Sequence, residues 1–512
     1  VYIDGIRADN GGGFSGFVGA GGPATPSRLD DLNPAAIQRV EILKGAAAAT
    51  LFGSEASNGV IQIFTKRGEA GQDPRFNLSV EQAISQAPER RTPDQVGFAE
   101  TQDQVEQMSQ FYGGDDGVQQ YELVGHSAIK DLLQTGYTQT YSGSVEGGTE
   151  TITYFASGRF STEDGPVGIP SGLSGPASDE VTRGQGNVNI GIFPSEASRI
   201  RVTARYSETD FSTIAAGNNI YGVLAVASGS NPRRVTELQE YGGSFATLEE
   251  TLQQSIDQET QRFSGNVNGN YRPIDPLTLD ATFGVDFTNT FGEELRPFGW
   301  DVDGLVGANT DGLREIADTR NLELTLDTKA ILDNDIGDNL TSSLTVGTQG
   351  FITRQTVVSL SGAGFPGPGF NVASAASRFD REETFQEIVQ IGLFAQEQVG
   401  IGDFVFVTGG VRLDANSAFG DDFNTVTYPK VSASVVPSDA GFWPSGGIGP
   451  ISSLRFRGAV GQSGLQPGAF DALTTFGPLS PPGGSGFVPD NLGNENLKPE
   501  ISTEWELGTE VG

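Results

Sequence analysis

Few side chains in this sequence of 512 residues have the types and spacing that covalent or metal chemistry needs. His126 is the single histidine and cysteine is absent, so a Ser-His-Asp triad or a zinc centre has at most one such residue to use. We expect His126 in a loop. Asp333, Asp335 and Asp338 resemble the start of a calcium-binding loop, but Leu344 stands where that loop needs its bidentate glutamate. The sequence therefore predicts no catalytic centre, no metal site and no cofactor.

The remaining acidic residues are best interpreted as a solvated surface. Asp and Glu number 65 against 31 Lys and Arg, and the formal net charge is -34. This balance argues against nucleic-acid binding, which requires a basic face. The pairs Asp115-Asp116 and Asp421-Asp422 are expected in solvated loops, with weak Ca²⁺ binding as the alternative. The acidic residues are too many for the sequence to exclude the carboxylate pair of a glycosidase.

Arginine forms a more informative pattern. Arg199, Arg201 and Arg205 alternate with apolar residues such as Ile200 and Val202. Successive side chains of a strand point to opposite faces, so the three arginines share one face. We predict that they line the interior of a barrel, where they form salt bridges to acidic groups of an inner domain or of the wall. The alternative is that they contact a ligand in transit.

The elements that would position this row are strands of a membrane barrel. No run of about 18 apolar residues exists, so no transmembrane helix is predicted. Beyond residue 68, segments of about ten residues alternate apolar and polar side chains, as the strands of an outer-membrane barrel do. About fourteen such strands follow from Arg75 onward. Residues 93–112, rich in Gln and Glu, are the one helix-like exception.

The connections between these segments alternate in length. Short connections are predicted at 147–150, 194–197, 273–276, 333–339 and 400–403. Long ones are predicted at 164–182, 212–258, 292–318, 355–383 and 465–499. In an outer-membrane barrel the short turns face the periplasm and the long loops face outside, whereas a soluble sandwich has no reason to place every long loop at one end. The predicted fold is thus mainly β, a transmembrane antiparallel β-barrel.

The first 68 residues follow a different pattern. Asn33 and Pro34 predict the start of a short helix that runs to about residue 38. A short apolar run at 40–43 predicts a buried strand, 46–52 a helix and Val60–Thr65 a second strand. Between these elements lie Lys44, Gly45, Gly53, Asn58 and Gly59, which we expect to form the turns. The result is a small α/β unit without a phosphate-binding glycine loop.

Several stretches together resemble one family. They are VYIDGIRADN at the start, LNPAAIQRVEILKGAAAATLFGSEASNGVIQIFTKRG at 32–68, and later YPKVSASVV, LRFRGAVGQSG and NENLKPEISTEWELG. These resemble TonB-dependent outer-membrane receptors, and the alanine run after LKG is similar to the SusC/RagA-type subgroup. The resemblance implies a partial chain: residues 1–70 would be the C-terminal part of a plug domain lodged in the lumen, and residues 71–512 about 14 of the roughly 22 strands of the barrel.

The resemblance also implies a function. Such receptors sit in the outer membrane of Gram-negative bacteria and import a bulky nutrient with energy passed on by TonB, ExbB and ExbD. For this subgroup the nutrient is an oligosaccharide or a peptide, captured with a SusD-like lipoprotein. The contact with TonB would use a segment that precedes Val1. A siderophore or metal-chelate receptor is the alternative within the class, and a secreted β-rich adhesin or glycan-active enzyme the alternative outside it.

A glycine-rich stretch at 8–26 is the candidate ligand-binding loop. The resemblance places it at the plug apex, facing outside. It carries Asp9, Asn10, Phe14 and Phe17 on backbone with little intrinsic structure. Aromatic faces combined with a few hydrogen-bonding groups suit sugars and peptides. A disordered linker is the alternative.

Overall fold

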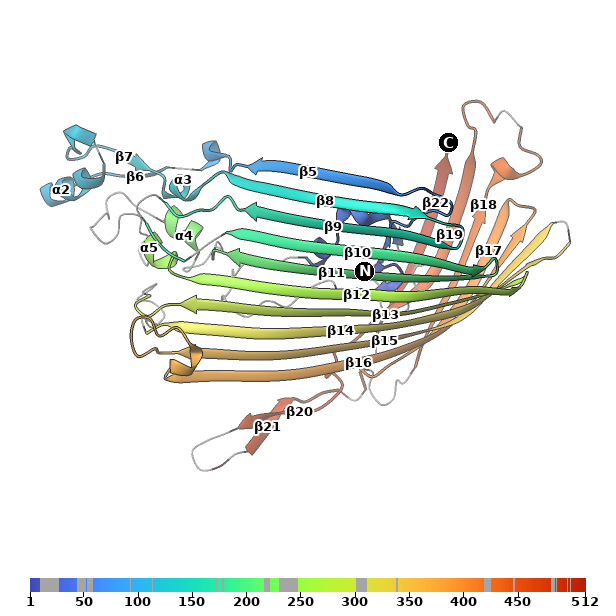
Figure 1. The fold of residues 1–512 in the computed structure, drawn as a ribbon. Coiled ribbons are helices and arrows are strands. Elements are labelled where there is room, and N and C mark those ends of the chain that lie inside the picture. Colours follow the sequence, from blue (N-terminus) through green and yellow to red (C-terminus); the bar gives the residue numbers. More distant parts are fainter. Residues whose placement is uncertain are drawn as a thin grey trace.

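The fold was derived from a computed structural model. It describes the chain except residues 10–26, 44–51, 53–58, 93, 113, 171–172, 177–178, 216–221, 230–246, 301–310, 338, 419–424, 445–446, 480–483, 485, 495 and 498. Figure 1 shows one long sheet with the N-terminal unit lying against it. Within this described part of the chain, no helix has the length and apolarity needed to cross a membrane.

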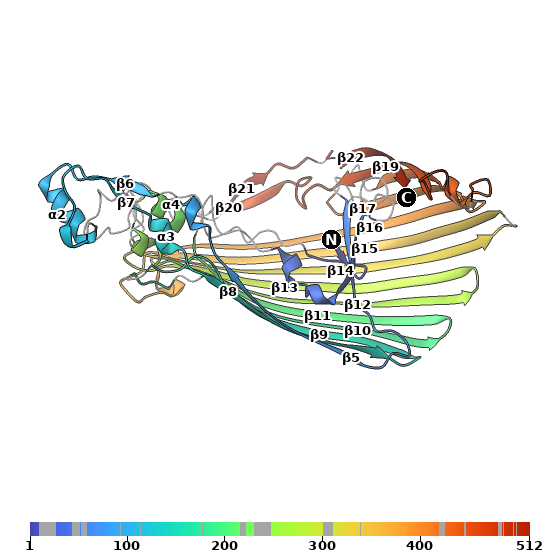
Figure 2. The same cartoon turned by 90° about the horizontal axis from the view of Figure 1, so that it is seen from above.

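The long sheet contains fourteen antiparallel strands in the described part of the chain, which confirms the predicted number. The strands are β5 (Arg75–Ser85), β8 (Gly136–Gly148), β9 (Ile152–Asp164), β10 (Glu180–Ser195), β11 (Ser198–Thr213), β12 (Ser255–Ile274), β13 (Leu277–Arg296), β14 (Leu313–Asp335), β15 (Leu340–Ala363), β16 (Arg378–Ile401), β17 (Val405–Asn416), β18 (Val426–Val435), β19 (Leu454–Leu465) and β22 (Glu500–Val511). Each pairs with its neighbour in this order. Seen from above, the sheet curves around the N-terminal unit (Figure 2).

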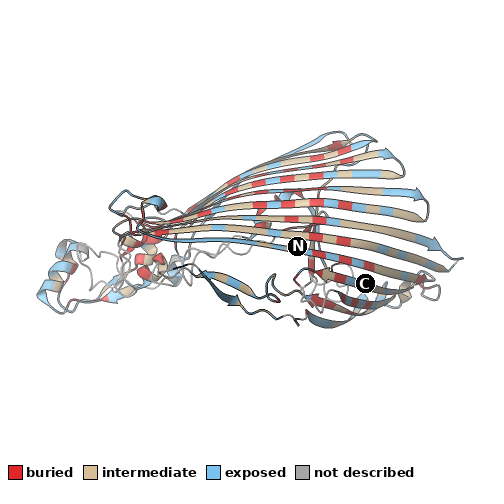
Figure 3. Cartoon of the chain, turned by 90° about the horizontal axis from the view of Figure 1, so that it is seen from below, coloured by how far each residue is buried: buried red, intermediate tan, exposed pale blue. Residues whose placement is uncertain are grey.

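The two faces of the sheet differ as the alternating pattern requires. On β11, Thr203 and Arg205 are buried on the concave face, whereas Val202 and Tyr206 are exposed on the convex face. Buried positions gather toward the middle of the strands, where the N-terminal unit lies (Figure 3). A polar concave face and an apolar convex face are the arrangement of a barrel wall with lipid outside.

The predicted alternation of connections is confirmed from β8 to β17. The strands run further than the sequence pattern indicated, so the long connections are shorter than predicted. β15, for example, pairs with β16 from Leu340↔Ile401 to Ala363↔Arg378 without interruption. Backbone pairing continues there although the apolar alternation fades, because ladder hydrogen bonds do not depend on side-chain type. The alternation itself ends after β17, since the connection 436–453 between β18 and β19 is longer than the one before it.

The connection between β5 and β8 forms a projecting arm. It contains η4 (Glu89–Arg91), β6 (Gln95–Gly97), α2 (Gln102–Phe111), η5 (Gly114–Asp116) and β7 (Val124–His126). The predicted helix at 93–112 therefore starts too early. Thr101 begins α2 with a reciprocal capping box to Gln104, and the residues before it pair as a strand with β7. His126 lies in that strand, so the prediction of a loop at this position is wrong.

The other long connections pack together at the same end of the sheet. They contain α4 (Val223–Ser228), α5 (Leu248–Thr251) and η7 (Ala373–Ala375), and α3 (Ala128–Leu132) at the end of the β5–β8 connection packs with them. Leu132, Val226, Leu252 and Trp300 share one buried apolar cluster drawn from three different connections. A hairpin of β20 (Thr475–Leu479) and β21 (Gly486–Asn491) lies before β22, and η8 (Pro437–Asp439) lies at the opposite end of the wall.

The N-terminal unit is built on a four-stranded sheet in the order β2-β1-β4-β3. Its elements are β1 (Tyr2–Ile3), β2 (Ile6–Arg7), η1 (Arg28–Asp31), η2 (Pro34–Ala36), β3 (Ile37–Leu43) and β4 (Val60–Thr65). β4 has the predicted bounds. The predicted helix at 46–52 lies outside the described residues except for Phe52, which is buried.

Two predictions for this unit are wrong in detail. Asn33 does cap a helix, since its Oδ1 accepts a hydrogen bond from the Ala35 N–H at 3.0 Å. The helix is only a single 3₁₀ turn, however. β3 begins directly after it at Ile37, because the residues from Ile37 onward pair with β4. The strand is also not buried: Val40 and Ile42 are exposed, since β3 is the edge strand of its sheet.

Candidate functional site

The candidate site is the polar contact layer between the N-terminal unit and the concave face of the large sheet. Its first anchor is Asp4 in the turn that joins β1 to β2. Asp4 has φ 50° and Gly5 has φ 87°, the left-handed pair of a two-residue hairpin turn for which Asp-Gly is the favoured sequence. The turn presents the Asp4 carboxylate to β11. There Oδ2 accepts a hydrogen bond from Arg205 Nη1 at 2.7 Å, while the Thr65 N–H and hydroxyl donate to the same carboxylate at 2.9 and 2.8 Å.

The second anchor is Arg262 on β12, whose guanidinium holds both the wall and the N-terminal unit. Its Nε and Nη2 donate to the Asp286 carboxylate on β13, with a shortest distance of 2.9 Å. Its remaining donors reach the backbone oxygens of Arg28 and Asp9 at 2.9 and 3.2 Å, and the Asp31 carboxylate at 3.5 Å. The planar five-donor fork of arginine suits such a multiple contact.

Asp31 is the acidic member of this cluster on the N-terminal unit. Its carboxylate lies 3.7 Å from Arg28 Nη1 and is almost completely buried. Burial raises the pKa of the Asp31 carboxyl above its ordinary value, and the Arg28 and Arg262 guanidinium groups oppose that rise.

Further polar contacts surround the two anchors. The Gln185 side chain donates to the Asp30 backbone oxygen at 2.8 Å, and the Asn321 side chain donates to the Asp9 carboxylate at 3.1 Å. The Arg7 N–H donates to Thr325 Oγ1 at 3.2 Å. Four strands, β10, β11, β12 and β14, therefore hold the unit through hydrogen bonds.

Close steric fit accompanies the polar contacts. Ile6 lies against Gly284 on β13 so closely that an added Cβ there would be 2.1 Å from Ile6 Cγ2. The Tyr2 ring packs edge-on against Phe351 of β15, with ring centroids 6.3 Å apart. A cavity beside Arg205 and Arg262 has a volume of only about 10 Å³, room for roughly one water molecule. Among the described residues, these contacts hold the N-terminal unit against the wall.

The three arginines predicted to line the interior have different contacts in the structure. Arg205 makes the ion pair with Asp4 and donates to Ser264 at 2.9 Å. Arg201 lies on the same face, in register with Gly191 and Asn268 on the neighbouring strands. Arg199 lies over the Phe193 ring at 5.2 Å. The contact between Arg205 and Asp4 is thus a salt bridge between the large sheet and the N-terminal unit, as the first of the two interpretations requires.

The other predicted site residues fall into two groups. Asp9 lies against the wall through Asn321 and Arg262. Gly59 has φ 83°, as the predicted turn before β4 requires. Asn33 and Pro34 begin η2. The remaining predicted residues lie outside the described part of the chain: Asn10, Phe14, Phe17, Lys44, Gly45, Gly53 and Asn58.

Sequence reasoning missed the partners of the arginines. Asp4, Asp31 and Asp286 were not singled out among 65 acidic residues. One signal was available for Asp4, because Asp-Gly between two short apolar strands predicts a tight hairpin turn. In the described part of the chain no group of three or more His, Cys, Asp or Glu side chains could hold a metal ion.

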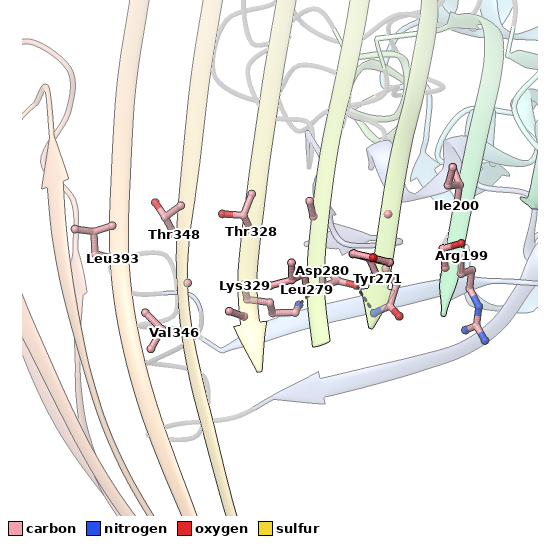
Figure 4. A pocket seen from close by; sticks show the side chains of 16 residues that line it. Arg199, Ile200, Tyr271, Leu279, Asp280, Thr328, Lys329, Val346, Thr348 and Leu393 are labelled. Carbon is pink, nitrogen blue, oxygen red and sulfur yellow. Dashed lines mark hydrogen bonds and ion pairs between the residues drawn. The ribbon is translucent and has the colours of Figure 1, made fainter. Parts of the chain in front are cut away.

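Another hollow lies on the convex face of the sheet. It has a volume of about 770 Å³ and spans β11 to β16. Figure 4 shows Ile200, Tyr271, Leu279, Val346 and Leu393 around it. Gly269 and Ala281, in register with Ile200, create the depression. An open apolar hollow on this face suits lipid chains better than a soluble nutrient.

Comparisons with known proteins agree with this architecture. The family model "TonB dependent receptor-like, beta-barrel" matches residues 203–512, more than half of the chain, and "TonB-dependent Receptor Plug Domain" matches residues 1–60. The chain therefore belongs to the TonB-dependent receptor family, with the N-terminal unit as plug and the large sheet as barrel wall.

Individual curated relatives carry the same family name. The TonB-dependent receptor SusC of Bacteroides thetaiotaomicron is 24% identical over 297 residues, 54% of this chain and 25% of SusC. TonB-dependent receptor P3 of Formosa agariphila is 22% identical over 97% of this chain and 48% of its own length. The chain thus spans between a quarter and about half of these curated relatives.

Solved structures show the same fold. The RagAB peptide transporter superposes with a TM-score of 0.76 at 19% identity, covering 94% of this chain and 57% of that one. The siderophore receptor PirA from Acinetobacter baumannii gives a TM-score of 0.55 at 16% identity, covering 100% of this chain and 60% of that one. These likenesses concern the fold alone.

Proposed function

We propose that this protein acts as an outer-membrane importer of a bulky nutrient, an oligosaccharide or a peptide, in a Gram-negative bacterium. The observation that carries the proposal is the plug held inside the curved wall by polar contacts. Hydrogen bonds and ion pairs between side chains can be exchanged for contacts with water when the plug moves, at a net cost of about 1 kcal/mol each. An interface of this kind is held firmly at rest and can still be released by an applied force.

TonB, with ExbB and ExbD, is the proposed source of that force. A SusD-like surface lipoprotein is the proposed partner at the outer face, where the long connections lie. The division into a plug at 1–70 and a wall at 71–512 is part of the same proposal. It is supported by β4 ending at Thr65 and β5 beginning at Arg75.

The proposed class of nutrient is inferred from the resemblance to the SusC/RagA-type subgroup. The RagAB peptide transporter matches this fold better than the siderophore receptor PirA, with TM-scores of 0.76 and 0.55. This difference favours a peptide or oligosaccharide over a siderophore. Membership of a receptor family favours an importer over an adhesin or a glycan-active enzyme. The proposed ligand contacts are Asp9, Asn10, Phe14 and Phe17 of the apex loop.

Two measurements test the proposal. Cell fractionation should place the complete receptor in the outer membrane as a heat-modifiable band. Growth on defined oligosaccharides and peptides should then require the receptor and intact TonB. A soluble secreted protein, or uptake that is unchanged without TonB, would contradict it.

A further inference from the structure

The concave face of the sheet also has a hollow, here called the basic hollow. It has a volume of about 500 Å³ and is lined by residues of β16, β17, β18, β19 and β22, which are neighbours in the sheet (Figure 1). Three of its side chains are basic and one is acidic: Lys430, Arg455, Arg457 and Glu506. The chain as a whole has the opposite balance, with 31 Lys and Arg against 65 Asp and Glu. The hollow is thus a local excess of positive charge, and its size lies within the range of about 300–1,000 Å³ that is usual for ligand pockets.

The register of the strands explains the space in the basic hollow. On β17, Thr408 alternates with the buried Arg412, so both share the concave face. Two rows of paired residues cross this face: Gln398, Thr408, Ser432, Ala459 and Glu506 in one, and Gly400, Phe406, Ser434, Arg457 and Gly508 in the next. Ser432, Ser434 and Ala459 have short side chains, so the wall is hollowed at their positions. The longer polar and basic side chains surround the gap.

The three basic side chains come from two adjacent strands. Lys430 of β18 is buried, and its Nζ donates to Gln396 Oε1 at 3.5 Å. Arg455 and Arg457 are two residues apart on β19, so they point to the same face. Arg455 Nε donates to Ser434 Oγ at 2.9 Å. Neighbouring contacts thus orient Lys430 and Arg455 within the hollow.

The acidic partners of the two arginines bind them only weakly. Arg457 Nη2 lies 3.0 Å from Glu506 Oε1, and the Glu510 carboxylate lies 3.6 Å from Arg455 and from Arg457. All four side chains are 38–52% exposed. Exposed ion pairs of this kind contribute only about 0–1 kcal/mol each. A carboxylate that enters the hollow can therefore replace Glu506 or Glu510 at little cost.

The basic hollow lies toward the end of the wall that carries the short turns. Gln398 lies three residues before the end of β16, and Thr408 three residues after the start of β17. The plug packs against the middle of the strands (Figure 3). Under the proposed function the short turns face the periplasm. The hollow then lies on the exit side of the plug, where a nutrient passes once the plug has moved.

We propose that the basic hollow is a transit site for a nutrient that carries carboxylate groups, supplied by an acidic peptide or by an oligosaccharide of uronic acids. The inference rests on the proposed function and narrows its class of nutrient. Arg455 and Arg457 bind the carboxylate, since the guanidinium fork matches its geometry. Gln398, Thr408 and Ser432 offer hydrogen bonds to the hydroxyl or amide groups beside it. A hollow with one sign of charge also raises the local concentration of anions, by about tenfold or more.

The absence of cysteine from these 512 residues permits a direct test of the charge in the hollow. Ser432→Cys introduces a thiol there in the complete receptor, with any cysteine elsewhere replaced by serine. The rates of its modification by an anionic and a cationic methanethiosulfonate reagent are compared, because their ratio cancels the reactivity of the thiol itself. We expect the ratio to favour the anionic reagent about tenfold. Combining Arg455→Gln with Arg457→Gln should remove most of this preference. Arg354→Gln is the matched control, since Arg354 is 48% exposed and paired with Glu387 on the convex face.

Protection of the same thiol identifies the source of the carboxylate. Triglutamate represents acidic peptides and trigalacturonate represents uronic acids, while triglutamine and maltotriose are neutral probes of the same lengths. Labelling by an uncharged maleimide should be about tenfold slower at about ten times the Kd of a carboxylate probe, since only unoccupied sites react. The neutral probes should not slow it. The double arginine variant should lose the protection, and its heat-modifiability should stay normal because its ion pairs are exposed.

Several outcomes would overturn the inference. They are a rate ratio near one, a ratio that the double arginine variant leaves unchanged, a thiol that no reagent reaches, and protection by no carboxylate probe or equally by the neutral ones. TonB-dependent uptake by cells with the unaltered receptor separates the two proposals. If that uptake occurs while the labelling tests fail, only the transit site is refuted. If it does not occur, the proposed function fails.

Discussion

Replacing Asp4 with Asn should loosen the plug while leaving the wall intact. The substitution keeps the shape of the side chain and tolerates the left-handed φ at this position, since Asn adopts such angles more readily than most residues. It removes the negative charge that faces Arg205, whose side chain is only 9% exposed. Removing one partner of a buried ion pair costs roughly 3–5 kcal/mol. The new amide oxygen can still accept one hydrogen bond from Arg205, so we expect about 3 kcal/mol, the lower end of that range.

Such a loss would raise the unseated fraction of plugs about a hundredfold. In whole cells it should appear as leakage of large antibiotics, and in the purified complete receptor as faster proteolysis of the plug at an unchanged amount of folded barrel. Asp210→Asn is the matched control, because Asp210 lies on β11, as Arg205 does, but is exposed on the convex face. Adding Arg205→Gln to Asp4→Asn removes the uncompensated charge and should recover part of the loss. Normal plug retention in Asp4→Asn, or a double variant worse than the sum of the single ones, would refute the reasoning.

Three further predictions concern the same molecule. Gly284→Ala should weaken the binding of the plug to the wall by about 1–3 kcal/mol, because the added carbon clashes with Ile6. Gly186→Ala is the control and should have no such effect, since no atom lies within 4 Å of the added carbon. The rate of plug proteolysis distinguishes the two variants. Burial raises the pKa of Asp31, so the folded plug stabilises the charged form of this carboxyl less well than water does. Asp31→Asn should therefore raise the unseated fraction less than tenfold, and a larger leak would contradict this. Trimming residues 10–22 in the complete receptor should weaken nutrient binding with barrel assembly unchanged, as measured by calorimetry and heat-modifiability; unchanged affinity would move ligand selection to the outer connections.

Much of the wall was predictable because barrel strands follow a local rule. Alternation in a segment such as β11 assigns Arg205 inward and Tyr206 outward without knowledge of any other strand. The ends of the strands were less predictable. Pairing between β15 and β16 continues past the alternating region, because backbone hydrogen bonds form with any side chain.

Helix boundaries failed for a related reason. The composition of residues 93–112 favours a helix throughout, yet β6 forms within it, since a pairing partner is available 29 residues later at β7. Likewise, η2 stops after one turn because β4 pairs with the following residues. In both places a tertiary contact outweighs a helix propensity that is worth only tenths of a kcal/mol per residue.

By itself the sequence determined the kind of protein: a polar-lined wall of about fourteen strands, its outer and inner faces, and a small α/β unit before it. It also placed Arg205 among the inward-facing arginines. Only the tertiary structure decided which acid each arginine meets. Asp4 and Arg205 are 201 residues apart, and Arg262 and Asp31 are 231 apart. No local pattern can select one carboxylate from 65 across such separations; the curvature of the sheet and the seating of the turn at Asp4 bring these particular groups together.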